Sequence, residues 1–172
     1  MNEIREIVTK AVIAKGKKTI RLKSIVVPTY DTFSILGCWV INHGFSATLE
    51  NDCVNINGNF EINIWYAYDE NRKTDVARYV QEYTDTIKTR QIVKDVNSTK
   101  DVIVRVLQQP TCTNASITEK GIEVDVVLEE AVDVIGETKI AVTAFSNIDT
   151  DTIDESFENE INENFINENI VR

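Results

Sequence analysis

The stretch CVNINGNFEINIWYAY, residues 53–68, alternates apolar and polar residues along its length. One parity holds the apolar residues Val54, Ile56, Phe60, Ile62, Ile64, Tyr66 and Tyr68. The other parity holds mostly polar residues, namely Asn55, Asn57, Asn59, Glu61 and Asn63. Because successive side chains of a strand point to opposite faces of a sheet, this pattern predicts a long strand with one buried face. We expect a bend or bulge at Gly58, and we expect Trp65, on the polar parity, at a sheet edge or a contact surface.

The same two-residue period continues in the other segments up to residue 145. The predicted strands are residues 7–14, 19–27, 33–45, 74–89 and 101–109, with two more inside 122–145. Glycine and proline interrupt strands, so we place the breaks at Gly16, Pro28, Pro110 and Gly136. No segment before residue 150 has a helical pattern. The fold class predicted for residues 1–145 is therefore all-β, a single β-sandwich or barrel-like domain of about seven strands.

Residues 146–172 differ in composition from the rest and form an acidic, Asn-rich tail. Four apolar residues recur there at intervals of four: Ile153, Phe157, Ile161 and Phe165. Thr152 and Glu155 have the spacing of a capping box, which favours a short amphipathic helix. Asparagine is a poor helix former, and the alternative is a disordered tail that folds when it binds a partner. In both cases the four apolar residues are the candidate partner-binding positions.

Charge is distributed unevenly along the chain, whose net charge is −10. Residues 1–30 hold seven Lys and Arg against two acids, while residues 149–172 hold eight acids against one Arg. The two ends could pair with each other, pair with neighbouring copies, or remain as two solvated segments. Nucleic acid is not an expected partner, because the basic stretch is short and the overall charge repels phosphate.

The length of 172 residues suits one main domain that buries a core without disulfides or metals. No apolar run approaches the roughly 18–20 residues of a membrane span, so no transmembrane segment is expected. The start of the chain, MNEIREIVTK, carries acids and lacks the apolar stretch of a secretory signal. We therefore expect synthesis and retention in a cytosol.

Three cysteines, Cys38, Cys53 and Cys112, occur without a CxxC pair, and the chain has one histidine. A zinc site usually needs four such ligands at short spacing, so no metal or other cofactor is expected. In a cytosolic chain the default is three reduced thiols packed as small apolar side chains. The odd count leaves open a second interpretation, disulfides between chains in an oxidising setting.

The stretch SILGCWVINH, residues 34–43, raises the question of a Cys–His reactive centre. On a regular strand Cys38 and His43 point to opposite faces and lie about 16 Å apart, which argues against a working pair. Phosphate-binding glycine loops and the GxSxG nucleophile motif are also missing from the sequence. We therefore predict no enzyme and no catalytic residue. The stretch is interpreted as a buried strand, with His43 near its end and bonded to backbone.

Several runs together resemble the CotE family of outer spore coat morphogenetic proteins. They occur in the family's order and are REIVTKAVIAKGKK (5–18), SILGCWVINH (34–43), INIWYAYDENRKTDVARYV (62–80), RVLQQPTC (105–112) and VIGETKIAV (134–142). The family has a second glycine where this chain has Cys38, which argues against a shared essential role for that thiol.

The resemblance implies a non-enzymatic scaffold made in the mother-cell cytoplasm of sporulating bacteria and incorporated into the outer coat. It also implies a homo-oligomer that contacts other spore coat proteins, including the morphogenetic protein of the basement layer. In such proteins the β body is linked to self-association and the acidic tail to recruitment. A rival hypothesis is a ligand-binding or glycan-binding β-sandwich that uses Trp65, Tyr66 and Tyr68 and has no assembly role.

Overall fold

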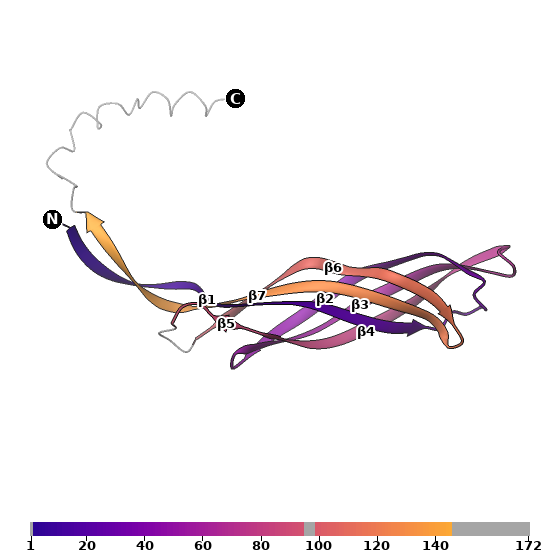
Figure 1. The fold of residues 1–172 in the computed structure, drawn as a ribbon, viewed down its shortest axis with the longest axis horizontal. Coiled ribbons are helices and arrows are strands. Elements are labelled where there is room, and N and C mark those ends of the chain that lie inside the picture. The colour runs from indigo at the N-terminus through magenta and orange to yellow at the C-terminus, as the bar shows by residue number, and fades with distance from the viewer. Residues whose placement is uncertain (1, 95–98, 146–172) are drawn as a thin grey trace, which may run out of the picture. The chain divides into compact units, whose positions relative to one another are not determined.

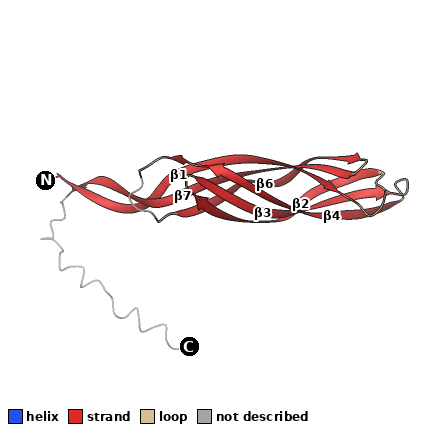
Figure 2. Cartoon of the chain, turned by 90° about the horizontal axis from the view of Figure 1, so that it is seen from below, coloured by secondary structure: helices blue, strands red, loops and turns tan. Residues whose placement is uncertain are grey.

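The computed structural model describes residues 2–94 and 99–145, and every regular element in these ranges is a strand (Figures 1 and 2). The strands are β1 (Asn2–Val26), β2 (Ser34–Glu50), β3 (Cys53–Tyr68), β4 (Lys73–Lys88), β5 (Arg90–Gln91), β6 (Asp101–Thr118) and β7 (Gly121–Phe145). They form a four-stranded sheet in the order β5-β1-β7-β6 and a three-stranded sheet in the order β2-β3-β4. The all-β prediction is confirmed.

The chain divides into two units. The body comprises residues 7–140, and a smaller unit combines residues 1–6 with residues 141–172. In the smaller unit the described residues are strand, and Arg5 forms an ion pair with Glu3 at 2.9 Å. The predicted tail, with Ile153, Phe157, Ile161 and Phe165, lies outside the described residues. The features discussed below belong to the body.

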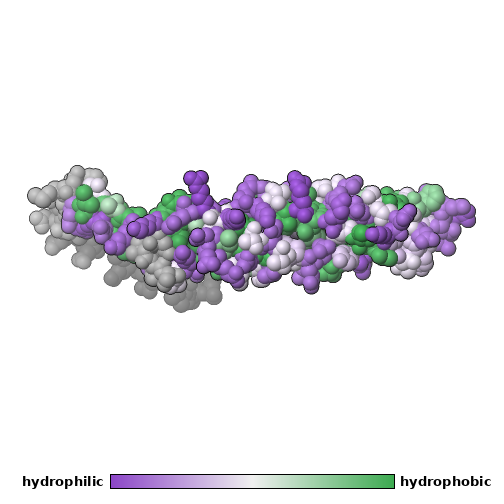
Figure 3. Space-filling view, turned by 60° about the horizontal axis from the view of Figure 1, so that its bottom comes forward, coloured by the Kyte–Doolittle hydropathy of each residue, from purple (hydrophilic) through white to green (hydrophobic). Residues whose placement is uncertain are grey.

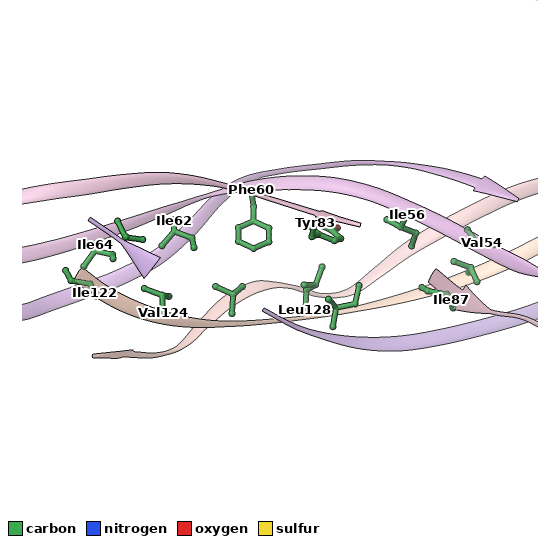
Figure 4. Packing of buried hydrophobic residues seen from close by; sticks show 14 of the residues in the cluster. Val54, Ile56, Phe60, Ile62, Ile64, Tyr83, Ile87, Ile122, Val124 and Leu128 are labelled. Carbon is green, nitrogen blue, oxygen red and sulfur yellow. The ribbon is translucent and has the colours of Figure 1, made fainter. Parts of the chain in front are cut away.

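The hydrophobic core of the body lies between the two sheets, and β3 supplies its largest share from the three-stranded sheet (Figure 4). The residues of β3 that are completely buried are Val54, Ile56, Phe60, Ile62, Ile64 and Tyr66. Their partners on β7 include Ile122, Val124, Val126 and Leu128. The parity pattern of residues 53–68 therefore predicts the buried face correctly. Asn63 is an exception: it lies on the polar parity, yet it is only 3% exposed and its amide donates a hydrogen bond to Glu61.

The predicted irregularity at Gly58 lies instead in the neighbouring strand. β3 pairs with β4 without interruption, and Gly58 lies opposite Tyr83. A Cβ atom at Gly58 would approach the Tyr83 ring to 2.5 Å, so the glycine makes room for that ring. The bulge is in β2, where the register shifts between Ile41 and Gly44. Asn42, within the bulge, has a φ of 56°.

Three of the predicted strand breaks are wrong, because the strands pass through them. β1 continues through Gly16, where a Cβ would lie 2.6 Å from the carbonyl oxygen of Lys88, so the glycine permits a close approach to β4. β6 continues through Pro110, and its register with β7 shifts between Gln108 and Thr111, which accommodates a residue that has no N–H. β7 likewise passes through Gly136.

We predict that Gly58→Ala destabilises the body by about 1–3 kcal/mol, because the added methyl group overpacks the Tyr83 ring. Gly44→Ala is the matched control, since nothing lies within 4 Å of a Cβ at that position. Its effect should stay within about 0.5 kcal/mol. Urea unfolding followed by circular dichroism measures both. Equal losses of stability in the two variants would contradict this role of Gly58.

Candidate functional site

The bulge in β2 brings the side chains of Cys38 and His43 to the same side of the strand. One additional residue in a strand reverses the parity of everything that follows it. Cys38 packs against the core cluster, and the His43 side chain is 7% exposed. The expectation that the two residues point to opposite faces is therefore wrong. His43 also lies inside β2 rather than near its end, and its ring contacts side chains rather than backbone.

The residues around His43 form a hydrogen-bonded group that we call the interior polar cluster: His43, Tyr83, Gln109 and Glu130. The His43 Nε2 atom lies 2.7 Å from the Tyr83 hydroxyl, which donates to Glu130 Oε1 at 3.0 Å. The His43 Nδ1 atom lies 3.3 Å from Gln109 Oε1. These residues come from β2, β4, β6 and β7. The bond between Tyr83 and Glu130 connects the two sheets in the core, while Gln109 is exposed at the rim of the cluster.

Burial shifts the pKa values of two members of this cluster, Glu130 and Tyr83. Glu130 is completely buried, and this burial raises the pKa of its carboxyl group. The charge of Asp85 raises that pKa further, while the hydrogen bond from Tyr83 and the proximity of His43 oppose the increase. Burial also raises the pKa of Tyr83, followed by the negative charge of Glu130, so the phenol remains neutral. When Glu130 is ionised, Tyr83 donates to it and His43 Nε2–H donates to the Tyr83 oxygen.

The position of the cluster determines what it can do. Glu130 has no exposed surface, and its Oε2 atom lacks a hydrogen-bond partner among the described residues. A solute therefore cannot contact this carboxyl group unless the two sheets separate. Buried polar groups that bond across a core select one arrangement of the elements over alternatives. We interpret the cluster as a brace between the sheets.

The outer face of the three-stranded sheet has a polar half built from short side chains. Rows across the sheet place Asn57 beside Thr84 and Asn55 beside Thr86, and each threonine hydroxyl donates to the asparagine at 2.8 Å. An open groove of about 540 Å³ lies in this region, lined in part by Gly44, Asn57 and Thr84. Asn55 and Asn57 thus accept hydrogen bonds from the neighbouring strand β4 in addition to facing solvent.

The other half of this face carries the apolar patch, which we define as Trp39, Ile41, Trp65 and Val80. Each is 42–59% exposed. Strand register places them together, because Ile41 and Val80 flank Glu61 in one row while Trp39 lies beside Asn63 in the next. Trp65 follows two residues after Asn63 on the same face. On the face of the molecule that Figure 3 shows, hydrophobic side chains lie among hydrophilic ones. Of the four patch residues, the sequence pointed to Trp65 alone as a contact.

The interpretation of residues 34–43 as a buried strand is therefore only half right. Cys38 and Val40 pack against the core, whereas Trp39 and Ile41 are exposed on the outer face. Apolar residues on both parities are the signal that could have indicated a strand with two contact faces.

The aromatic residues of the glycan-binding hypothesis do not form one platform. Tyr66 is buried, accepts a hydrogen bond from the Tyr30 backbone N–H and donates to Asp75, both at 3.3 Å. Tyr68 stacks on the Tyr30 ring with centroids 4.3 Å apart. Both tyrosines thus hold the connection between β1 and β2. Trp65 points to the opposite face of β3.

The three cysteines are free and half-buried. The thiol of Cys38 on β2 interacts with that of Cys112 on β6, and burial followed by this neighbour raises the pKa of Cys38. Cys53 is at the first position of β3, where it pairs with Glu50 and Lys88.

Several basic residues of the N-terminal region form ion pairs within the body. Lys17 pairs with Glu129 at 2.7 Å, and Lys23 pairs with Glu123 at the same distance. Lys18 also contacts Asp85. The predicted alternatives for this region were pairing with the acidic tail, pairing with neighbouring copies, or a solvated segment. In the described residues these three lysines pair with acids of β4 and β7, and the tail lies outside the described residues.

Within residues 2–94 and 99–145, no group of three His, Cys, Asp or Glu side chains converges in a way that could hold a metal ion. Nor does this described part contain a helix of the length and apolarity needed to span a membrane.

The described part of the chain is an all-β protein in which a buried polar cluster connects two sheets and one outer face carries exposed tryptophans. The family of outer spore coat protein E (CotE) matches residues 3–170, so the chain belongs to this family. Its role is that of an outer spore coat protein that interacts with other coat proteins, and its location is the outer spore coat. Searches of curated proteins and of solved structures gave no match.

We predict that Glu130→Gln stabilises the protein near pH 7 by about 1 kcal/mol or more, because it removes a buried charge and keeps an acceptor for Tyr83. At pH values between the ordinary pKa of 4.5 and the raised pKa, Glu130 is protonated in the folded state and ionised in the unfolded state. Wild-type stability should therefore fall as pH rises from the ordinary value of 4.5 through the raised value. Glu130→Gln should show a flatter profile in urea unfolding between pH 4 and 8.

Glu130→Ala is the companion variant, and it should lose about 2–4 kcal/mol at every pH, since it leaves a cavity and an unpaired hydroxyl. A glutamine variant that is less stable than wild type at pH 7 and has the same pH profile would contradict the interpretation of the cluster.

Proposed function

We propose that this protein is a self-assembling scaffold of the outer spore coat. Its body associates with further copies of the same chain, and its acidic tail recruits other coat proteins, including the morphogenetic protein of the basement layer. It is synthesised in the mother-cell cytoplasm during sporulation and then incorporated into the coat. Membership of the outer spore coat protein E family supports this proposal.

The single observation that carries the self-assembly proposal is the apolar patch on the three-stranded sheet. Two tryptophans and two β-branched residues are exposed on one face around Glu61 and Asn63 of the central strand, with Arg78 at the end of the Trp39 row. Exposed aromatic side chains, tryptophan above all, are enriched at the contact points of protein interfaces. Solvation alone does not account for such a cluster, since scattered single apolar residues are the normal case.

The geometry of the patch suits another sheet face as its partner. Its residues come from three adjacent strands, so the surface is broad and follows the sheet. Beside it, the Asn and Thr rows present donors and acceptors without net charge, and these tolerate close approach by a second copy.

Binding of a glycan or another ligand is the second candidate function. Trp39 and Trp65 on one exposed face favour it, since aromatic rings bind the apolar faces of sugars. Tyr66 and Tyr68 cannot contribute to such a binding face, because both side chains are directed into the fold. A ligand would occupy the patch without changing the oligomeric state, and this separates the two hypotheses.

We predict that wild-type protein at micromolar concentration is a large homo-oligomer in multi-angle light scattering. The double variant Trp39→Ser with Trp65→Ser should shift the concentration of assembly upward at least tenfold, because each lost tryptophan contact contributes about 1–2 kcal/mol. Ile103→Ser is the matched control: Ile103 is 50% exposed on β6 of the other sheet and should leave assembly unchanged.

Circular dichroism and urea unfolding establish that the variants fold. A monomeric wild type, or assembly of the double variant at wild-type concentrations, would count against self-association through the patch.

We also predict that deletion of residues 146–172 preserves self-assembly and abolishes capture of coat proteins from an extract of sporulating cells. A full-length variant with Phe157→Ser and Phe165→Ser should show the same loss of capture, if the apolar residues of the tail make the contacts. Light scattering and affinity capture measure the two properties separately. Failure of the truncated body to assemble would overturn this division of roles.

A further inference from the structure

We propose that Cys38 and Cys112 are the two halves of a redox-responsive disulfide within one chain, which links the two sheets at the seam between β2 and β6. This inference goes beyond the proposed scaffold function and does not depend on it. It also differs from cross-linking between chains, because it assigns these two thiols to each other.

The seam is the place where the two sheets meet without a hydrogen-bonded ladder. β2 is an edge strand of the three-stranded sheet, and β6 is an edge strand of the four-stranded sheet. The two strands lie beside each other, and His43 and Gln109 form a side-chain contact across the seam. A covalent bond here would join strands that only side chains connect in the reduced protein.

Both cysteines face the interior of this seam. Cys38 and Cys112 pack against the same core cluster, each half-buried, and the two thiols interact with each other. Both strands are irregular where His43 contacts Gln109. β2 has its bulge between Ile41 and Gly44, and the register of β6 shifts on both sides of Gln108. Cys112 also donates to the Asn114 carbonyl oxygen at 3.5 Å, a weak bond that can be exchanged.

The two thiols have different chemical roles in the reaction. Burial raises the pKa of the Cys38 thiol, so Cys38 is the poorer nucleophile toward a reagent from solvent. The Cys112 thiolate therefore attacks a low-molecular-weight disulfide first, which forms a mixed disulfide and releases one small thiol. Cys38 then loses its proton and attacks the Cys112 sulfur, which forms the protein disulfide and releases the second small thiol. Two protein thiols are oxidised and one small disulfide is reduced to two thiols.

This assignment sharpens the role of Cys53. With Cys38 and Cys112 joined, Cys53 would be the thiol that remains for a link between chains. Cys53 is the first residue of β3 and directly follows Asn51 and Asp52, the turn residues of the hairpin between β2 and β3. Oxidation of the folded protein would thus close the sheets first and leave a single thiol per chain for assembly.

The experiment uses the full-length protein as an equal mixture of ¹⁵N-labelled and unlabelled chains. The protein is kept at submicromolar concentration and is incubated with oxidised glutathione. Remaining thiols are blocked with an alkylating agent, and the protein is analysed on non-reducing gels and by peptide mass spectrometry. We expect a Cys38–Cys112 linked peptide with no mixed isotope labels, monomer mobility on the gel and an alkylated Cys53. The urea midpoint of oxidised wild type should exceed that of the reduced protein.

Two variants keep the result interpretable. Cys53→Ser should form the same linked peptide and show the same shift in midpoint, whereas Cys112→Ser should show neither. Circular dichroism of the reduced variants confirms that they fold. Free Cys38 and Cys112 after oxidation, stable glutathione adducts on them, or linked peptides with mixed labels would each overturn the proposal.

Discussion

The hydrogen bond from the Tyr83 hydroxyl to the buried carboxyl group of Glu130 is the interaction on which the rest of the fold depends. It joins β4 of one sheet to β7 of the other at 3.0 Å in the middle of the core. Several sequence features make sense through it. Gly58 leaves space for the Tyr83 ring, and the bulge at Asn42 turns His43 inward so that it reaches the Tyr83 oxygen. An all-apolar core would tolerate sliding of the two sheets, but this polar cluster bonds well in one register.

The central strand and the fold class could be predicted from the sequence, and the details that build the interior cluster could not. Residues 53–68 alternate along almost their whole length, with Trp65 as the exception on the polar parity, so their buried parity was readable, and β3 begins and ends where the pattern does. In β2 the bulge adds a residue opposite Phe60, which reverses the parity that places His43. Nothing in the two-residue period announces such an insertion. Glu130 was equally hidden, because a carboxyl group next to apolar residues suggests the solvent face until its partner is known.

Glycine and proline were the other source of error, for a physical reason. Strand ends were predicted at Gly16 and Pro110, because strand interiors tolerate both residues poorly. In this protein Gly16 allows β1 to approach the Lys88 carbonyl group, and bulges absorb the missing N–H of Pro110. Tertiary packing thus reverses the local preference. The apolar patch was missed for a related reason. Trp39 lies beside Asn63 on the outer face, and this neighbour is known only from the strand pairing.

An interior connected by hydrogen bonds and an outer face with exposed tryptophans are compatible with the role of a coat protein that contacts other coat proteins. Membership of an outer spore coat family agrees with this division. The central claim, that copies associate through the patch, is tested most directly by hydroxyl-radical footprinting of wild-type protein in its assembled and dissociated forms. The account predicts that Trp39 and Trp65 are protected from oxidation on assembly, while Ile103 on the other sheet is oxidised equally in both. Equal oxidation of the two tryptophans in both forms would contradict it.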